Sequence, residues 1–174
     1  MSLTRIISIL FCVCVIWSLT GCAYRLSGSS QQNMTAGRTL WVPFIGNESI
    51  SPTAQTVLRR ALYDEFHALR GLVPAENEAA ADVTVKGKLV SYGSRAVSYN
   101  AADRVRAFSL QVAAELAVYR KGEITPLWKG ALSGSKEYPA NTDLALQHNA
   151  EEQAFESAAR IIARKLVSTM EHSY

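Results

Sequence analysis

Hydrophobic and polar residues alternate most clearly between positions 108 and 118. One set is apolar (Phe108, Leu110, Val112, Ala114, Leu116, Val118), and the residues between them are mostly polar or small. A period of two predicts a long strand with one buried face. A similar alternation over residues 82–92 predicts the strand before it. A turn at residues 121–123 and the segment 127–138 predict the strand that returns, so the three strands form a meander.

Two other segments repeat apolar residues at steps of three and four, the period of an amphipathic helix. The first follows Ser51 and Pro52, which predict a helix cap and a proline at the first helical position, and it ends at Gly71. The second follows a polar loop that starts at Pro139. Its expected core stripe is Phe155, Ala158, Ala159, Ile162, Leu166 and Met170.

A further strand is predicted where the folded domain begins, at Thr39. The run Leu40–Ile45 is apolar and β-prone and is closed by a Gly-Asn turn, while Pro43 favours a sheet edge or a bulge because it has no N–H to donate. The order is then strand, helix, three strands, helix. We therefore expect a single α+β domain over residues 39–174, a two-layer sandwich with two helices packed on one face of a four-stranded mixed sheet.

The first 38 residues have a different character. An apolar run, Ile6–Trp17, follows a lone Arg5 and leads to Leu19-Thr20-Gly21-Cys22. This pattern predicts a signal peptide over residues 1–21 and resembles the lipobox of bacterial lipoproteins, in which the cysteine is acylated. An uncleaved membrane anchor is the alternative, although the apolar part is short for a span. Residues 22–38 would then be a lipidated N-terminus and flexible tether.

Charge, cysteine content and the absence of catalytic motifs reduce the classes of function that the sequence favours. The formal net charge is +3 with no basic run, which argues against nucleic-acid binding. Cys12 and Cys14 lie in the segment to be removed and Cys22 would be lipidated, so we expect no disulfide. The three histidines lack zinc-site spacing, and no nucleophile motif is present. We expect a binding protein without a cofactor or metal rather than an enzyme acting on envelope polymers.

At Cys22-Ala23-Tyr24, Val42-Pro43-Phe44 and Trp128, the chain carries short motifs that resemble those of the lipopolysaccharide-assembly lipoprotein (LptE) family. The segment from Cys22 to Gly28 (CAYRLSG) is similar to the family's opening, Cys-Gly-Tyr/Phe-x-Leu-x-Gly, with Ala23 in place of the usual glycine. The resemblance implies an outer-membrane lipoprotein that plugs the lumen of a large LptD-type β-barrel and helps to place lipopolysaccharide in the outer leaflet. The remaining motifs keep the family's order: Val42-Pro43-Phe44, Asn47-Glu48-Ser49, Gly87, Trp128, Tyr138 and the closing Glu/Ala-rich helix.

The topology predicts where a ligand would bind. In a meander, the end of one strand and the start of the next lie at the same end of the sheet. The basic residues expected there are Arg95, Arg104, Arg106 and Lys136, with His148 in the neighbouring loop. Because lipid A carries phosphates, which guanidinium and ammonium groups bind, we expect this end to contact lipopolysaccharide. The alternative is that these are ordinary solvated charges beside Asp103 and Glu137.

Aromatic residues on the strands are candidates for contacts with a partner protein. The tyrosines Tyr92, Tyr99 and Tyr119 are candidates for contact with a barrel because aromatic residues are enriched at interfaces, although packing on the sheet is their commoner role. A periplasmic lipoprotein that activates a peptidoglycan synthase, or another envelope-assembly adaptor, is the alternative function.

Overall fold

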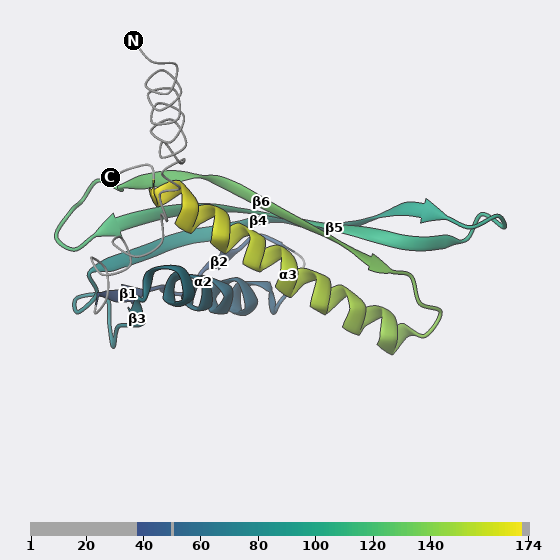
Figure 1. Cartoon of the computed structure of the whole chain (residues 1–174), viewed down its shortest axis with the longest axis horizontal. Helices are drawn as coiled ribbons and strands as arrows, with labels where there is room; N and C mark the ends of the chain where they lie inside the picture. The colour runs from purple at the N-terminus through teal and green to yellow at the C-terminus, as the bar shows by residue number, and fades with distance from the viewer. Residues whose placement is uncertain (1–37, 50, 172–174) are drawn as a thin grey trace, which may run out of the picture. The chain divides into compact units, whose positions relative to one another are not determined.

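A computed structural model describes residues 38–49 and 51–171, which form one mixed sheet with two helices on the same side of it (Figure 1). The predicted signal peptide, Cys22 and the tether lie outside these residues. None of the described helices is long and apolar enough to cross a membrane. The elements are β1 Thr39–Trp41, β2 Gly46–Asn47, α2 Ala54–Arg70, β3 Val73–Pro74, β4 Val83–Tyr99, β5 Val105–Arg120, β6 Trp128–Pro139 and α3 Leu144–Glu171.

The three long strands form the antiparallel meander that the alternation predicted, in the order β4-β5-β6. The short strands β1 and β2 each pair with β4 in parallel, and β3 pairs with β1 in parallel. The fold is therefore the expected α+β two-layer arrangement, with six strands in the sheet rather than four.

The predicted strand at residues 40–45 ends early, at Trp41, and the Gly46-Asn47 pair, predicted as its closing turn, forms the short strand β2 instead. The other additional strand is β3, after helix α2. Pro43 has no N–H, and the neighbouring Val42 turns its main-chain groups toward helix α2 instead of the sheet. The Val42 N–H donates to the Tyr63 hydroxyl at 2.9 Å, and the Val42 carbonyl accepts from Arg59 Nε at 2.8 Å. Pairing with β4 resumes only at Gly46, which lies opposite Lys88.

Helix α2 starts later than predicted and ends where predicted. Ser51 is not its cap: the Ser51 carbonyl accepts from Asn47 Nδ2 at 2.7 Å, and the N-cap residue is Thr53, which makes no side-chain cap hydrogen bond. At the other end, Gly71 adopts a left-handed conformation with φ 67°, and its N–H bonds the His67 carbonyl at 2.8 Å. This is the glycine stop expected from the sequence.

The core lies between the sheet and the two helices. On the face that the alternation predicted to be buried, Phe108 is half-buried and Leu110, Val112, Ala114, Leu116 and Val118 are fully buried. Every member of the predicted α3 stripe is also buried. Helix α3 packs closely on β6, because a Cβ added to Gly134 would lie 2.3 Å from the Ala158 carbonyl oxygen. The face of the sheet that includes Leu110 and Gly134 is called the helix face below, and the opposite face is called the outer face.

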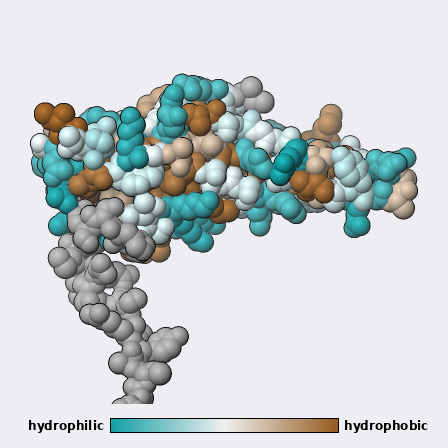
Figure 2. Space-filling view, turned by 90° about the horizontal axis from the view of Figure 1, so that it is seen from above, coloured by the Kyte–Doolittle hydropathy of each residue, from teal (hydrophilic) through white to brown (hydrophobic). Residues whose placement is uncertain are grey.

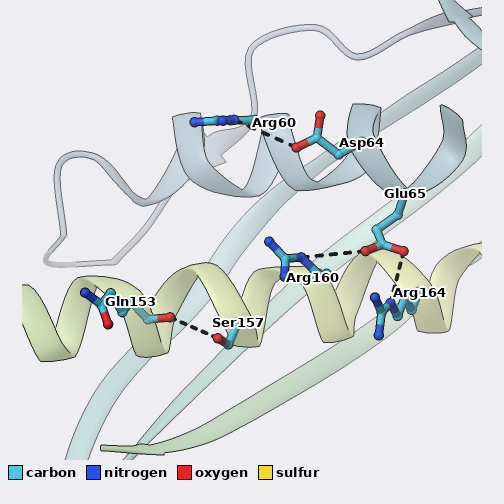
Figure 3. A network of polar contacts seen from close by, with 7 residues as sticks. All are labelled: Arg60, Asp64, Glu65, Gln153, Ser157, Arg160 and Arg164. Carbon is cyan, nitrogen blue, oxygen red and sulfur yellow. Dashed lines mark hydrogen bonds and ion pairs between the residues drawn. The ribbon is translucent and has the colours of Figure 1, made fainter. Parts of the chain in front are cut away.

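An ion-pair network joins the two helices (Figure 3). Glu65 of α2 points toward α3, where its carboxylate lies 3.0 Å from Arg164 Nε and 3.7 Å from Arg160 Nε. The Glu65 side chain is only 8% exposed, while both arginine side chains are more than half exposed. The carboxylate is therefore buried in the helix interface, and its charge is balanced by cations at the interface rim.

Strands β4 and β5 continue past the helices as a two-stranded hairpin, which projects to the right in Figure 1. The sequence predicted that the first of these strands would stop near Tyr92, whereas β4 extends to Tyr99. Three interruptions of regular pairing accompany this extension, between Leu89 and Ser91, between Ala96 and Ser98, and between Ser98 and Tyr99. Such bulges increase the local twist of a sheet.

Candidate functional site

Basic residues from all three long strands lie at the end of the sheet that carries the β4–β5 loop. We call this the basic end and define it by Arg95 on β4, Arg104 in the loop, Arg106 on β5 and Lys136 on β6. Strand pairing brings Arg95 and Lys136 to the same level of the sheet. Arg95 lies opposite Ser109 and Lys136 lies opposite Leu110, and these two partners are adjacent residues of β5. Residues far apart in sequence thus become neighbours through strand pairing.

Asn100 holds the loop that presents Arg104. Its side-chain oxygen accepts from the N–H of Ala102 at 2.9 Å and from the N–H of Arg104 at 3.0 Å. Its main-chain N–H also donates to the Arg104 carbonyl at 2.9 Å. Asp103 completes the turn with φ 54°, a left-handed conformation that aspartate tolerates better than most residues. The loop is therefore closed by local hydrogen bonds.

The four cations are divided between the two faces of the hairpin. Paired residues share a face, and successive residues of a strand alternate between faces. Lys136 lies opposite Leu110, a core residue, so it belongs to the helix face, and so does Arg106, four residues before Leu110. Arg95 lies opposite Ser109 and belongs to the outer face. A ligand that touched all four would have to follow the rim of the sheet.

All four cations are exposed and available to an anion. In the described part of the chain, none of them makes a side-chain ion pair, although Asp103 and Glu137 lie at the same end. Several basic residues elsewhere are paired: Lys88 Nζ, for example, lies 3.0 Å from Glu48 and 3.8 Å from Glu115. No existing pair has to be broken when an anionic group binds at the basic end.

His148 does not lie in a loop, contrary to the sequence prediction. Helix α3 starts at Leu144, so His148 is inside its second turn, and its Nε2 lies 3.2 Å from Glu152 on the next turn. Asp143 explains the early start, because its side chain accepts from the N–H of Ala145 at 2.8 Å and of Leu146 at 3.1 Å. This aspartate cap is a sequence signal that the prediction missed.

The three candidate tyrosines lie in three different environments. Tyr92 is half-buried: its hydroxyl donates to Glu151 Oε1 at 2.8 Å, and its ring meets Phe155 edge-on at 5.3 Å. Burial, with the hydrogen bond to Glu151, raises the pKa of Tyr92. Tyr119 lies at the opposite end of the sheet under Lys86. Tyr99 alone is at the basic end and is 58% exposed.

A second aromatic pair supports the basic end from the helix face. Phe108 stacks on Tyr138 with ring centroids 5.6 Å apart, and the Tyr138 hydroxyl lies 2.7 Å from Ser94 Oγ. Burial raises the pKa of Tyr138, which remains a neutral hydroxyl near pH 7. These contacts connect β4, β5 and β6 where the projecting hairpin begins.

Exposed apolar side chains lie on the strand that leads into the β4–β5 loop and at the start of the helix that follows β6. Val97 and Tyr99 are 38% and 58% exposed on β4, and Leu144 and Leu146 are 86% and 57% exposed at the start of α3. Helix α3 follows β6 after a short loop whose Ala140 N–H bonds the Arg106 carbonyl at 2.9 Å. Figure 2 shows such hydrophobic patches scattered among hydrophilic surface on one face of the molecule. Cations beside exposed apolar groups suit an amphiphile with anionic groups.

Residues suited to metal binding do not gather in the described part of the chain, where no group of three or more His, Cys, Asp or Glu side chains could hold an ion.

Comparison with known proteins gives a family and a fold. A family model described as LptE, lipopolysaccharide-assembly, matches residues 37–170. This range covers all the described helices and strands, apart from Glu171 at the end of α3. No curated protein matches the chain.

Solved structures share the fold at low sequence identity. A putative lipoprotein from Caulobacter crescentus is 17% identical with a TM-score of 0.51, covering 72% of this chain and 88% of its own. The rare lipoprotein B from Shewanella oneidensis is 15% identical with a TM-score of 0.52, covering 78% and 96%. A hypothetical protein from Chlamydia trachomatis is 10% identical with a TM-score of 0.54, covering 79% and 98%.

Proposed function

Because the chain belongs to the LptE family of lipopolysaccharide-assembly proteins, we propose that it is an outer-membrane lipoprotein that binds lipopolysaccharide at its basic end. In this proposal, acylation of Cys22 anchors the chain on the periplasmic side of the outer membrane. The domain rests in the lumen of an LptD-type β-barrel and assists the assembly of lipopolysaccharide there. It acts by binding and positioning rather than by catalysis.

The observation that carries the proposal is the group of exposed, unpaired cations beside exposed apolar side chains. Guanidinium groups such as those of Arg104 and Arg106 bind phosphate through paired, charge-assisted hydrogen bonds. The apolar surface of Val97 and Tyr99 lies on the strand that leads into the same loop. Lipopolysaccharide combines phosphates with acyl chains, so both kinds of contact would be used.

The length of the sheet supports a role that reaches across a membrane. Strand β5 has 16 residues, which at about 3.3 Å per residue makes it about 50 Å long, compared with a hydrocarbon core of about 30 Å. The domain starts at the other end of the sheet, where the Thr39 N–H donates to Asp82 Oδ2 at 2.9 Å. The first described residues therefore lie at the end opposite the basic end.

The outer face of the sheet is suited to the water-lined interior of a barrel. Exposed residues on this face include Ser91 on β4, Gln111 on β5, and Ser133 and Ser135 on β6. Their side chains are short or hydrogen-bonding, and barrel lumens in the outer membrane are lined with polar residues. Contact with a lumen wall would satisfy these groups, whereas contact with lipid chains would not.

Binding can be tested with purified full-length lipoprotein in detergent by measuring how much lipopolysaccharide it retains. We expect the double variant Arg104→Glu/Arg106→Glu to retain at least about tenfold less, since each charge-assisted hydrogen bond contributes about 1.5 kcal/mol or more. The matched control is Lys121→Glu/Lys129→Glu, which makes the same charge change at the opposite end of β5 and β6 and should retain lipopolysaccharide normally. Equal retention by the two double variants would overturn the assignment of the site.

The barrel partner needs a separate experiment. Tagged full-length chain recovered from detergent-solubilised envelopes should bring with it a large β-barrel protein of the LptD type, identified by mass spectrometry. Recovery of a peptidoglycan synthase instead would support the adaptor function and contradict the plug.

A further inference from the structure

The segment Val42-Pro43-Phe44 follows β1 and is attached to helix α2. Val42 and Ile45 are fully buried, and both main-chain polar groups of Val42 bind side chains of α2. Phe44 lies between these two buried residues and is itself 73% exposed. The fold therefore holds a large aromatic side chain on the surface at a fixed place beside α2.

Arg59 of α2 is held at the same place by three contacts. Its Nε donates to the Val42 carbonyl at 2.8 Å. Its guanidinium carbon lies 5.9 Å from the centre of the Trp41 ring and 5.7 Å from the centre of the Tyr63 ring, and both distances are in the range of a cation–π interaction. The guanidinium is therefore ordered before any ligand binds, which lowers the entropy that binding would cost.

The charge of Arg59 is not balanced by an acidic side chain of the described chain. Within residues 38–49 and 51–171, Arg59 makes no ion pair, and its two Nη groups make no hydrogen bond. Both acids of α2, Asp64 and Glu65, pair with other arginines. Glu48, which follows the segment, lies 3.0 Å from Lys88. The two Nη groups can therefore bind a carboxylate from another source.

We call this surface the Arg59 corner and define it by Trp41, Phe44, Arg59 and Tyr63. Trp, Tyr and Arg are the residues most enriched among those that dominate the free energy of protein–protein binding. Trp41 and Tyr63 are half-buried, so each keeps part of its surface open to solvent. The corner thus combines an ordered cation with exposed aromatic surface, which is the composition of a protein-binding surface.

Charge complementarity indicates an acidic occupant from outside this chain. Residues 1–38, the predicted leader and tether, contain neither Asp nor Glu, so they cannot supply the carboxylate. The acids close to the corner in sequence already have basic partners. An acidic protein segment with an apolar side chain near its carboxylate would use the Nη groups and Phe44 together.

We propose that the Arg59 corner is the docking site for an acidic segment of a partner protein. An Asp or Glu of that segment binds the Nη groups of Arg59, and a neighbouring apolar side chain packs on Phe44. The inference does not depend on lipopolysaccharide binding. Arg59→Gln should leave the lipopolysaccharide retained by the purified lipoprotein unchanged, so failure of one proposal is distinguishable from failure of the other.

A photoreactive residue, p-benzoylphenylalanine, in place of Phe44 identifies the occupant. It is introduced into the full-length chain in its native envelope, and mass spectrometry maps the segment that becomes attached. We expect a segment of another protein that carries Asp or Glu within about three residues of the attachment point, since side chains two apart share one side of an extended segment.

The dependence on charge is measured in the same photoreactive chain. Arg59→Gln should lower the yield of the adduct by about tenfold, because the carboxylate loses its charge-assisted hydrogen bonds. Arg60→Gln is the matched control. It removes the same charge at the next residue of α2, where the side chain is 80% exposed and Nε lies 3.8 Å from Asp64, and it should leave the yield unchanged.

The reciprocal change leaves this chain unaltered. Replacing the mapped carboxylate of the partner by the corresponding amide should lower the yield as much as Arg59→Gln does. The two changes together should lower it no further, because both remove the same contact. The proposal would be overturned by the absence of an adduct, by adducts with lipid or a second copy only, or by a mapped segment without Asp or Glu. Equal losses from Arg59→Gln and Arg60→Gln, or additive losses in the reciprocal test, would also overturn it.

Discussion

Gly134 fixes how closely helix α3 packs on the sheet, and enlarging it is the sharpest test of that packing. The glycine lies in β6 on the helix face, and its missing side chain makes room for the α3 main chain. A Cβ at this position would lie 2.3 Å from the Ala158 carbonyl oxygen and 3.2 Å from Ile162 Cγ1. Gly134→Ala therefore forces a main-chain movement, because the nearest atom is not a flexible side chain.

The expected loss of stability can be estimated from the distance that α3 has to move. Bringing the Cβ to an ordinary contact distance requires α3 to move by about 1 Å, and overpacking of this kind costs about 2 kcal/mol in the free energy of unfolding. For a domain of this size, each kcal/mol shifts the melting temperature by about 4 °C. We expect Gly134→Ala to melt about 8 °C below the unaltered protein.

Gly93→Ala is the matched control. Gly93 is exposed on β4, and a Cβ added there would meet nothing within 4 Å. The substitution should be neutral, or stabilise by up to about 0.5 kcal/mol because alanine restricts the unfolded chain. Thermal and urea unfolding of both variants, followed by circular dichroism, measure the difference. Equal melting temperatures for the two variants would refute the close contact between α3 and β6.

Two further predictions concern polar contacts of the helices. Glu65→Gln removes the charge that faces Arg160 and Arg164. It should lower the free energy of unfolding by about 1–2 kcal/mol; the loss is modest because both arginines are largely exposed, so water screens the ion pairs. An unchanged urea midpoint would contradict this. Burial raises the pKa of Tyr92 above its unfolded value of about 10, so the folded state holds this proton more tightly and stability should fall as pH rises above about 10. Tyr92→Phe should lose about 1 kcal/mol at pH 7 with its hydrogen bond to Glu151 and show a weaker alkaline decline; an unchanged pH profile would argue against it.

The long elements could be predicted from the sequence because their patterns are local. The period-two run from Phe108 to Val118 and the apolar stripe of α3 each repeat often enough to define an element and its buried face. The short strands could not be predicted in this way. A strand of two residues has no period, and the break near Pro43 depends on a hydrogen bond from Val42 to Tyr63, which is 21 residues away.

The candidate site was predictable only in part, for a similar reason. Strand order is enough to place Arg95 and Lys136 at one end of the sheet, but their opposite faces depend on the pairing register and on a bulge in β4 between Leu89 and Ser91. His148 was misplaced because the cap formed by Asp143 was not recognised. The stacking of Phe108 on Tyr138 joins neighbouring strands and left no signal in either segment alone.

The most direct test of lipopolysaccharide binding at the basic end is site-specific photo-crosslinking in living cells. A photoreactive residue at Val97, near the β4–β5 loop, should form an adduct with lipopolysaccharide. The same residue at Ile124, an exposed apolar position in the turn at the opposite end of β5, should not. An adduct at Ile124 alone, or equal adducts at both positions, would contradict the assignment of the basic end as the lipopolysaccharide site.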